Sequence, residues 1–311
     1  MIATITLNPS IDQNLEVRGL LKDDANRALR VSHTAGGKGL NVSKVVRELG
    51  GSTRAYALLG GFTGGWHRDL AKELDFPIHA SLIRGETRVN AVVTAQKDRT
   101  QTRVSAPGPR VCAADLHRLL NKLLRVRPQP RFWVLGGSLP VGMQNDIYQK
   151  LILILQRTGT ACVLDTDNEA LKKGIHAKPF MIKPNEFEMA RLLGRSLHSL
   201  KDYAAAAKHL AEKGVSLVAV SLAERGAIFV TKKEAIHVTT PKVKVQSKVG
   251  AGDSLIGGVI LGLVRGFSLE RAACLGVAAS TSAVMREAPR LCLKTDIRPL
   301  LRRVRAHRLV L

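Results

Sequence analysis

Strand-like and helix-like segments alternate along most of the chain, and this rhythm limits the folds that it can adopt. Expected strands lie at 2–7, 53–59, 132–135, 161–164, 180–182 and 216–220, and expected helices at 39–49, 66–74, 113–124, 145–156, 185–193 and 201–213. Repeated strand–helix units predict a three-layer α/β domain, in which helices cover both faces of a mainly parallel central sheet. Ligands of such sheets bind at the carboxyl ends of the strands. Glycine turns expected at 36–39, 60–65, 136–138 and 250–252 all follow strands, which favours one shared crevice.

Four polar strand-like stretches interrupt this rhythm, near 15–18, 28–34, 89–95 and 100–104. We expect them to form a small separate sheet, a lid built from strands inserted near 13–34 and 87–105. No linker, low-complexity run or internal repeat divides the sequence. Residues 1–311 are therefore predicted to form a single domain with a lid.

The chain is strongly basic, with 48 Lys and Arg against 25 Asp and Glu and a formal net charge of +23. Such a field attracts polyanions, including nucleic acids, acidic membranes and phosphorylated metabolites. The densest basic segment is the tail, which contains Arg298, Arg302, Arg303, Arg305 and Arg308. The 7 Phe, 3 Tyr and 2 Trp do not interleave with that tail, so a base-stacking platform is poorly supported and nucleic acid is not an expected partner.

Expectations for the compartment, disulfides and structural zinc follow from four observations. Met1 is followed at once by strand-like I-A-T-I-T-L, and the longest uncharged apolar run, 255–264, is half the length that a bilayer requires. We therefore expect a soluble, cytoplasmic protein with no membrane partner. The 4 cysteines never form C-x-x-C and the 9 histidines show no paired metal spacing, so neither a disulfide framework nor a structural zinc site is expected.

Residues 249–254 read V-G-A-G-D-S and run into the apolar stretch L-I-G-G-V-I-L-G-L. This pattern predicts a glycine-rich turn that opens a helix, with Asp253 in the first turn. Gly250 and Gly252 allow backbone N–H groups to converge, and the helix N-terminus adds partial positive charge, so the turn suits an anion. A carboxylate would repel a phosphate, but it can act as the base for a hydroxyl that attacks one. Taken alone, the hexapeptide is equally compatible with a helix start that Asp253 merely caps.

Other polar motifs follow predicted strands or open predicted helices. They are T-L-N-P-S-I-D at 6–12, A-G-G-K-G-L-N-V-S at 35–43, G-E-T-R at 85–88, T-R-V-S-A-P-G-P at 102–109, G-G-S-L-P at 136–140, K-P-N-E-F-E at 183–188 and S-L-A-E-R-G-A at 221–227. Two familiar phosphate motifs fail. G-G-K-G at 36–39 lacks the Ser or Thr of a Walker A loop, and G-G-F-T-G-G at 60–65 misses the spacing of a dinucleotide fingerprint.

In their order and separation these motifs resemble the ribokinase/PfkB carbohydrate kinase family, from residue 1 to about 295. The segments 35–43 and 247–260 are similar to the two signature regions of that family, with K-P-N-x-x-E between them. The start T-L-N-P-S-I-D, the lysine of A-G-G-K-G-L-N and G-E-T-R are typical of its phosphofructokinase and tagatose-6-phosphate kinase branch. The resemblance implies a ribokinase-like fold and an ATP-dependent kinase with an alcohol acceptor.

The resemblance also implies roles on the sugar side. Asp253 is similar to the catalytic base of the family, and the N–H groups of Gly250, Ala251 and Gly252 would form an anion hole for the transferred phosphoryl group. The residues that match contacts with sugar hydroxyls are Asp12, Gly37 and Asn41. The residues that would neutralise the phosphate already on the sugar are Lys38, Arg88 and Arg103, and Ser138 would lie near the substrate.

On the nucleotide side, the resemblance implies a second set of contacts. The residues that match it are Lys183, Asn185, Ser221, Gly226 and Gly252. Asn185 and Glu188 match an element that acts on Mg²⁺, a cation that favours sparse oxygen ligation supplemented by phosphates.

Each assignment also has a purely structural interpretation. Asp12 and Ser138 can cap turns, Lys38 can cover a helix face, and Arg88 and Arg103 can be solvated strand residues. Asn185 can be a helix cap alone, and Glu188 can simply complement the helix N-terminus.

Two positions depart from the family pattern. Lys248 stands where threonine is usual, and Ala223 stands where S-L-G-x-x-G has glycine. Lys248 can add a phosphate contact or crowd the nucleotide. Ala223 indicates either that this position does not need a positive φ or that the turn is shifted. Both changes concern nucleotide affinity and preference rather than the class of reaction.

We expect phosphorylation of a ketohexose phosphate, with fructose 6-phosphate as the first substrate and fructose 1,6-bisphosphate as the product. The reason is that T-R-V-S-A-P-G-P and V-Q-S-K-V-G-A-G-D-S look closest to the 6-phosphofructokinase members of the family. Tagatose-6-phosphate kinase and 1-phosphofructokinase are the alternatives within the branch. A non-catalytic sensor of sugar phosphate or nucleotide is the alternative from another class, and the intact Asp253 turn argues against it. The resemblance further implies a place in glycolysis and a homodimer formed through the lid.

Overall fold

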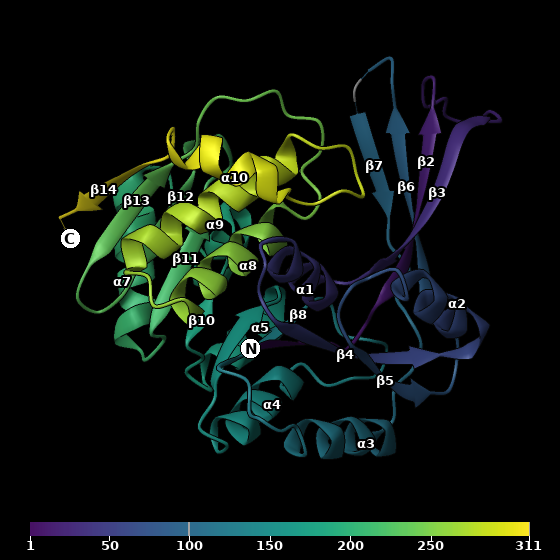
Figure 1. Cartoon of the computed structure of the whole chain (residues 1–311), viewed down its shortest axis with the longest axis horizontal. Coiled ribbons are helices and arrows are strands. Elements are labelled where there is room, and N and C mark those ends of the chain that lie inside the picture. Colours follow the sequence, from purple (N-terminus) through teal and green to yellow (C-terminus); the bar gives the residue numbers. More distant parts are fainter. Residues whose placement is uncertain (99, 311) are drawn as a thin grey trace.

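Ten strands form the main sheet of the computed structural model, which describes residues 1–98 and 100–310. They are β1 (Ile2–Thr6), β4 (Thr53–Gly60), β5 (Ile78–Ile83), β8 (Phe132–Gly136), β9 (Ala161–Asp165), β10 (Met181–Ile182), β11 (Leu217–Ser221), β12 (Ala227–Val230), β13 (Ala235–Thr239) and β14 (Arg305–Leu309). Their order is β14-β13-β12-β11-β10-β9-β8-β1-β4-β5 (Figure 1). In this order, the seven strands β11, β10, β9, β8, β1, β4 and β5 are each parallel to their neighbours within this set. Strands β12, β13 and β14 continue the sheet in antiparallel pairs. The parallel part brings the carboxyl ends of seven strands to one edge, where ligands of such sheets bind.

Helices cover both faces of this sheet, so the predicted three-layer arrangement is confirmed. One face carries α1 (Lys38–Glu48), α8 (Ala251–Val264), α9 (Leu269–Val284) and α10 (Lys294–Leu301), and the other carries α3 (Ala113–Leu124), α4 (Ile147–Gln156), α5 (Asn168–Ile175), α6 (Glu186–Leu193) and α7 (Leu200–Glu212). In Figure 1, α8, α9 and α10 lie in front of the green strands. Side chains of a strand alternate between the faces: Trp133 and Leu135 of β8 enter one core, and Phe132 and Val134 enter the other.

A second sheet projects from this body (Figure 1). It contains β2 (Ser10–Val17), β3 (Ala28–Gly36), β6 (Arg88–Ala95) and β7 (Thr100–Val104) in the order β3-β2-β6-β7. The central pair, β2 and β6, is parallel, and the outer pairs are antiparallel. Because β2 follows β1 closely and β3 leads directly into α1, the base of this sheet adjoins the carboxyl edge of the main sheet. The expected small β-sheet lid is therefore present.

Some expected elements differ from the structure. The turn predicted at 60–65 is wrong, because helix α2 (Gly61–Ala71) begins within it and also replaces the helix expected at 66–74. Glu86 accepts hydrogen bonds from the N–H groups of Phe62 and Thr63, which stabilises this early helix start despite its glycines. A short 3₁₀ turn (Ala223–Arg225) follows β11. Among the described residues, no helix combines the length and apolarity needed to cross a membrane.

Candidate active site

Asp253 lies in the first turn of α8, where the chain reverses through Gly250. Gly250 has φ 76°, a left-handed conformation that glycine adopts without a steric penalty. The following N–H groups begin the helix and have no carbonyl one turn earlier to bond, so they are available to an anion. Asp253 itself is 6% exposed, and Asn41 donates from Nδ2 to its Oδ2 over 2.8 Å. Asn41 thus links α1 to the carboxylate of α8.

The surroundings of Asp253 make it a base that titrates near neutrality. Burial raises the pKa of its carboxyl group, the nearby negative charge of Asp165 raises it further, and the result is about 6. Lys38, Asn41 and Lys183 oppose this rise because they favour the charged form. A carboxylate with a pKa near 6 is largely ionised at neutral pH, yet more basic than an ordinary aspartate.

Two lysines share a carboxylate that sequence reasoning missed. Asp165 ends β9 and its side chain is 2% exposed, and its two oxygens lie 3.2 Å from Lys38 Nζ and 3.4 Å from Lys183 Nζ. Burial alone would raise the pKa of Asp165, but the two lysines hold it below its ordinary value. Burial likewise opposes the charge of Lys38, yet Asp165, Asp253 and Glu188 together raise its pKa. The only available sequence signal was an Asp at the carboxyl end of a parallel strand.

Lys183 also adjoins the anion site. Its side chain is 6% exposed, and a Cβ placed on Gly252 would lie 3.1 Å from its Nζ. A glycine at position 252 therefore leaves room for the lysine ammonium beside the first turn of α8. The structure brings together Lys38, Lys183 and the Gly250–Asp253 turn, which sequence reasoning had assigned separately to the sugar phosphate, the nucleotide and the transferred group.

Asp12 occupies the junction between the lid and the main sheet. Its Oδ1 accepts hydrogen bonds from Ser10 Oγ and Asn90 Nδ2, both at 2.8 Å. Its Oδ2 lies against Gly36, where a Cβ would clash with it. Gly37 follows with φ 131° and is the N-cap of α1, so Asp12 and Asn41 flank the same glycine pair. Asn90 is a supporting residue that no sequence motif had indicated, and Ser10 belongs to the T-L-N-P-S-I-D motif but had no role assigned to it.

The two lid arginines, Arg88 and Arg103, differ in how far their guanidinium groups are available to a ligand. Arg88 donates from Nη1 to Ala106 O and from Nη2 to Asn8 O, both at 2.9 Å, so its guanidinium is partly committed to the backbone. Arg103 is exposed on β7, opposite Val92 of β6. Arg88 and Arg103 repel one another, which contributes to a lowered pKa of Arg88 after the larger effect of burial. An anion that binds between them would relieve this repulsion.

Ser138 lies at the end of the turn that follows β8. It is exposed, and its Oγ accepts from Asn8 Nδ2 over 3.2 Å. The same amide donates to Pro107 O over 3.0 Å. Asn8 therefore ties the turn after β8 to the loop that carries the end of the lid.

The predicted metal residues form a helix cap. Asn185 Oδ1 accepts from the N–H of Glu188 over 2.8 Å, and the N–H of Asn185 donates to Glu188 Oε2 over 2.9 Å. This reciprocal pair is a capping box at the start of α6. No cluster of three or more His, Cys, Asp or Glu suited to a metal occurs in the described residues 1–98 and 100–310. A metal here would need phosphate or water for most of its ligands.

The other residues predicted to contact the nucleotide lie at the end of β11 and in the turn that follows it. The N–H of Ser221 donates to Pro184 O over 3.1 Å, which places Ser221 beside the start of α6. Gly226 has φ 88°, and a Cβ there would clash with Val238 O. Ala223 has φ 49°, so the interpretation that this position does not need a positive φ is wrong. Lys248 is exposed.

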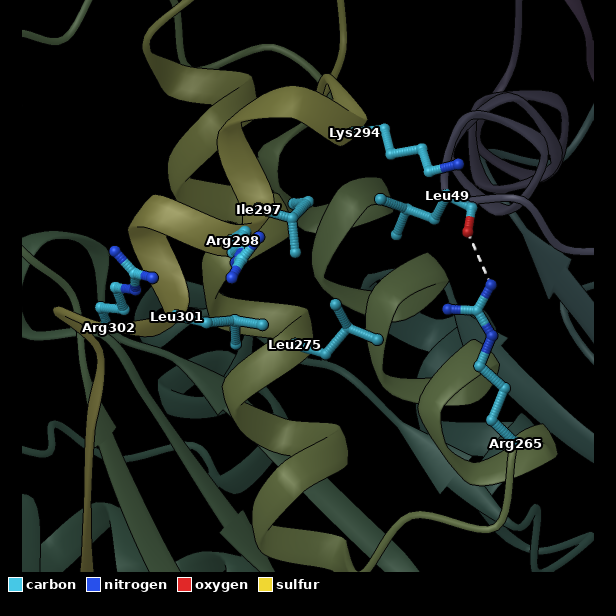
Figure 2. Close-up of a pocket in the computed structure, with 8 residues that line it drawn as sticks. All are labelled: Leu49, Arg265, Leu275, Lys294, Ile297, Arg298, Leu301 and Arg302. Atoms are coloured by element: carbon cyan, nitrogen blue, oxygen red, sulfur yellow. Dashed lines mark hydrogen bonds between the residues drawn. The ribbon is translucent and has the colours of Figure 1, made fainter.

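A cavity of about 450 Å³ lies at the carboxyl ends of α1 and α8, away from Asn41 and Asp253 at their amino ends (Figure 2). Its lining includes Leu49 and Leu275 but none of the predicted site residues. Arg265 Nη2 donates to Leu49 O over 2.7 Å, the bond drawn in Figure 2. This bond ties the carboxyl end of α8 to that of α1. The amino ends of the same two helices carry Asp253 and Asn41.

Known proteins with similar sequences and structures point to one family. The family model for pfkB family carbohydrate kinase matches residues 4–296. A 1-phosphofructokinase of Bacillus subtilis (strain 168) is 31% identical over 287 residues, which cover 92% of this chain and 93% of that protein. The ATP-dependent 6-phosphofructokinase isozyme 2 of Escherichia coli (strain K12) is 32% identical over 297 residues, covering 95% and 96%.

Solved structures agree with the sequence relatives. Phosphofructokinase-2 from Escherichia coli, solved in complex with fructose-6-phosphate and also in a tetrameric inhibited form, has a TM-score of 0.91 at 31% identity in both cases. Each covers 97% of this chain and 98% of the solved chain. Matches over nearly the whole length, together with the site around Asp253, show that this protein belongs to the pfkB family of carbohydrate kinases, enzymes that transfer a phosphoryl group to an alcohol.

Proposed function

We propose that this kinase transfers the γ-phosphoryl group of ATP to a hydroxyl of a ketohexose phosphate, with fructose 6-phosphate as its first substrate. The observation that carries the proposal is the buried carboxylate of Asp253. It has a pKa of about 6 and lies at a helix N-terminus with lysines nearby. A carboxylate in that position serves an attacking hydroxyl rather than a bound phosphate.

The transfer step divides between a base and a set of positive groups. Asp253 accepts the proton of the acceptor hydroxyl as its oxygen attacks phosphorus, while Asn41 fixes the orientation of the carboxylate through its 2.8 Å bond. The N–H groups of Gly250, Ala251 and Gly252 stabilise negative charge on the transferred group. Lys183, beside Gly252, adds a cation at the same place. Phosphoryl transfer needs mainly such positioning and charge stabilisation.

The sugar phosphate would bind between the lid and the carboxyl edge of the sheet. Asp12 has a carboxylate oxygen directed at Gly36, and with Gly37 and Asn41 it offers acceptors and donors to sugar hydroxyls. Arg103 is the freer of the two lid arginines, and it would carry most of the neutralisation of the sugar phosphate beside Arg88. Ser138 would contribute a hydroxyl at the edge of this site.

ATP and Mg²⁺ are the proposed co-substrate and cofactor. Lys183, Ser221 and Gly226 surround the carboxyl ends of β10 and β11, on the side of the sheet edge where the nucleotide would lie. Glu188 uses Oε2 for its cap, which leaves Oε1 for a hydrated cation, and Asn185 holds the helix start in place. Bound Mg²⁺ would neutralise phosphate charge and align the phosphoryl group, and it needs few protein ligands when phosphates supply the others.

Fructose 1-phosphate is the second candidate substrate, because relatives named 1-phosphofructokinase are as similar to this chain as the 6-phosphofructokinase isozyme. Tagatose 6-phosphate is the third. A coupled ADP-release assay with each of these sugar phosphates, and with fructose as the control, tests the proposal. Turnover with fructose 6-phosphate as the best substrate is expected. ATP binding without turnover on any sugar phosphate would contradict the proposed reaction.

We further propose that two chains pair through the lid and that the enzyme acts in glycolysis in the cytoplasm, where its substrates occur. Leu29 and Val31 of β3 and Val104 of β7 are large apolar residues with 57%, 49% and 63% of their surface exposed. A lid with this much exposed apolar surface gains stability when it is covered. The match to a protein with a tetrameric inhibited form also makes higher assemblies a result to look for.

A further inference from the structure

A partly buried lysine outside the described machinery lies one turn after Asn41 on α1. Lys44 Nζ donates to the backbone oxygen of Ala35 over 2.5 Å. Ala35 is 3% exposed and belongs to the end of β3, just before the glycine pair that begins α1. The lysine therefore holds the lid strand at the point where it enters the site.

The next carbonyl along the chain has an anchor of its own. His67 of α2 is fully buried, and its Nε2 lies 3.3 Å from Gly36 O. Burial lowers the pKa of His67 to about 4, so the ring is neutral at physiological pH, and a neutral ring facing a carbonyl donates from Nε2. Two successive carbonyls, those of Ala35 and Gly36, are thus held by side chains from two different helices.

This pair of anchors sets the position of the sugar-side carboxylate. Gly36 lies against Asp12 Oδ2, with no room for a Cβ between them. A shift of the strand end would change the space available to Asp12 Oδ2 and would also move Gly37, the next residue. The charge of Lys44 lies in the field of both Asp12 and Asp253, so it also offsets the repulsion between these two carboxylates and an incoming phosphate.

We infer that Lys44 is a positioning residue for the sugar phosphate: its ammonium fixes the Ala35–Gly37 segment and, through it, the carboxylate of Asp12. The inference rests on the proposed function, because it assigns the segment to the sugar site. Lys44 does not touch the transferred group, so its loss acts on substrate binding more than on the chemical step. Kinetics must separate these two effects.

Lys44→Met tests the anchor, and Arg47→Met, an exposed residue on the same helix, is the matched control. For Lys44→Met the KM for the sugar phosphate rises at least about tenfold, the loss of roughly one charge-assisted hydrogen bond, while kcat and the KM for ATP stay within about threefold. Arg47→Met leaves all three constants unchanged. Equal losses in both KM values, or a fall in kcat alone, would overturn the assignment.

The pH dependence gives a second readout that a merely structural role would not move. Burial lowers the pKa of Lys44 to about 8, against the opposing effect of Asp12 and Asp253. The groups that face it are Asp12 from β2, Asp253 from α8 and His67 from α2. The pKa values of His67 and Asp253 are about 4 and about 6, so the charges of these two groups change little above about pH 7.5. The KM for the sugar phosphate therefore rises in the wild type as the pH passes about 8. In Lys44→Arg it stays flat, because arginine keeps its charge. A rise that persists in Lys44→Arg would refute the inference.

Amide hydrogen exchange separates this inference from the proposed function. In the protein without ligands, Gly36 and Gly37 exchange faster in Lys44→Met than in the wild type or in Arg47→Met. Unchanged exchange in Lys44→Met would overturn the anchoring role whether or not the enzyme turns over sugar phosphates. Absence of turnover in the wild type, with faster exchange in Lys44→Met, would overturn the proposed function and leave the anchor supported.

Discussion

Asp253 is predicted to lower the stability of the protein at neutral pH. Burial, reinforced by the charge of Asp165, raises the pKa of its carboxyl group from an ordinary value of 3.8 to about 6. The folded chain therefore binds this proton more tightly than the unfolded chain does. Stability is lost as the pH rises through the interval between these two values, and it is fully lost above the folded value. A difference of about 2 pH units, at ~1.4 kcal/mol each, amounts to ~3 kcal/mol near pH 7.5.

Asp253→Asn removes this penalty together with the base. Asparagine keeps a side-chain oxygen that can accept the hydrogen bond from Asn41, so the site retains its packing. The free energy of unfolding, measured by urea denaturation, is expected to exceed that of the wild type by ~3 kcal/mol near pH 7.5 and by only ~1 kcal/mol near pH 4.5. Turnover is expected to fall at least ~10³-fold, the scale of a lost general base.

A carboxylate with the opposite shift provides the control. Hydrogen bonds from the backbone N–H groups of Ser199 and His198 lower the pKa of Asp202, so Asp202→Asn should lose stability at neutral pH rather than gain it. A gain for Asp253→Asn that is the same at both pH values would refute the electrostatic explanation. Retention of most of the turnover would refute the assignment of the base.

Four other outcomes follow from the structure. Arg103→Gln should raise the KM for the phosphorylated sugar about tenfold, and an equal loss with unphosphorylated fructose would contradict its phosphate role. Ala223→Gly should raise the free energy of unfolding by ~1 kcal/mol. A left-handed alanine costs ~1–2 kcal/mol, and the greater conformational entropy of glycine in the unfolded chain offsets part of the gain from removing it. A loss of stability in urea denaturation would show that this conformation is not strained. Val31→Glu should convert the proposed dimer to a monomer at micromolar concentration in light scattering, and an unchanged mass would exclude pairing through this strand. Treatment with a chelator should abolish turnover and added Mg²⁺ should restore it, whereas full activity in the chelator would argue against a metal.

Periodic apolar patterns predicted the helices and strands that bury one face in the core. Helix α3 has the expected bounds, Ala113–Leu124, because its leucines repeat at helical spacing between polar flanks. Strand β14 (Arg305–Leu309) was missed, since its basic sequence resembles a solvated tail and its place in the sheet comes from backbone bonds to β13. Helix α5 was missed because N-E-A-L-K-K-G-I is short and mostly polar.

Among the candidate site residues too, sequence motifs indicated some and gave no sign of others. Glycine-rich motifs predicted Asp253 and Asn41 as site residues, and T-L-N-P-S-I-D at the end of the first strand predicted Asp12, since tight turns at strand ends restrict the sequence strongly. Asp165 carried no motif, because a single carboxylate at the end of an apolar strand gains its role only from the two lysines that folding brings to it. The positive φ of Ala223 was likewise invisible, because alanine gives no sign of a strained backbone.

The contact between α1 and α8 determines which parts of this enzyme can change independently. Gly257 of α8 faces Val45 of α1, and a Cβ on that glycine would lie only 2.6 Å from the valine. These two closely packed helices, tied at their far ends by Arg265, hold Asn41 and Asp253 within a 2.8 Å hydrogen bond. The lid strands are joined to this pair through the short segment around Gly36 and Gly37 and through Gln101 of β7, which accepts a hydrogen bond from Ser247 Oγ just before the α8 turn. We therefore expect lid substitutions away from Gly36, Gly37 and Gln101 to change the preference for sugars while the geometry of Asn41 and Asp253 stays constant, so that specificity and rate can evolve separately in this fold.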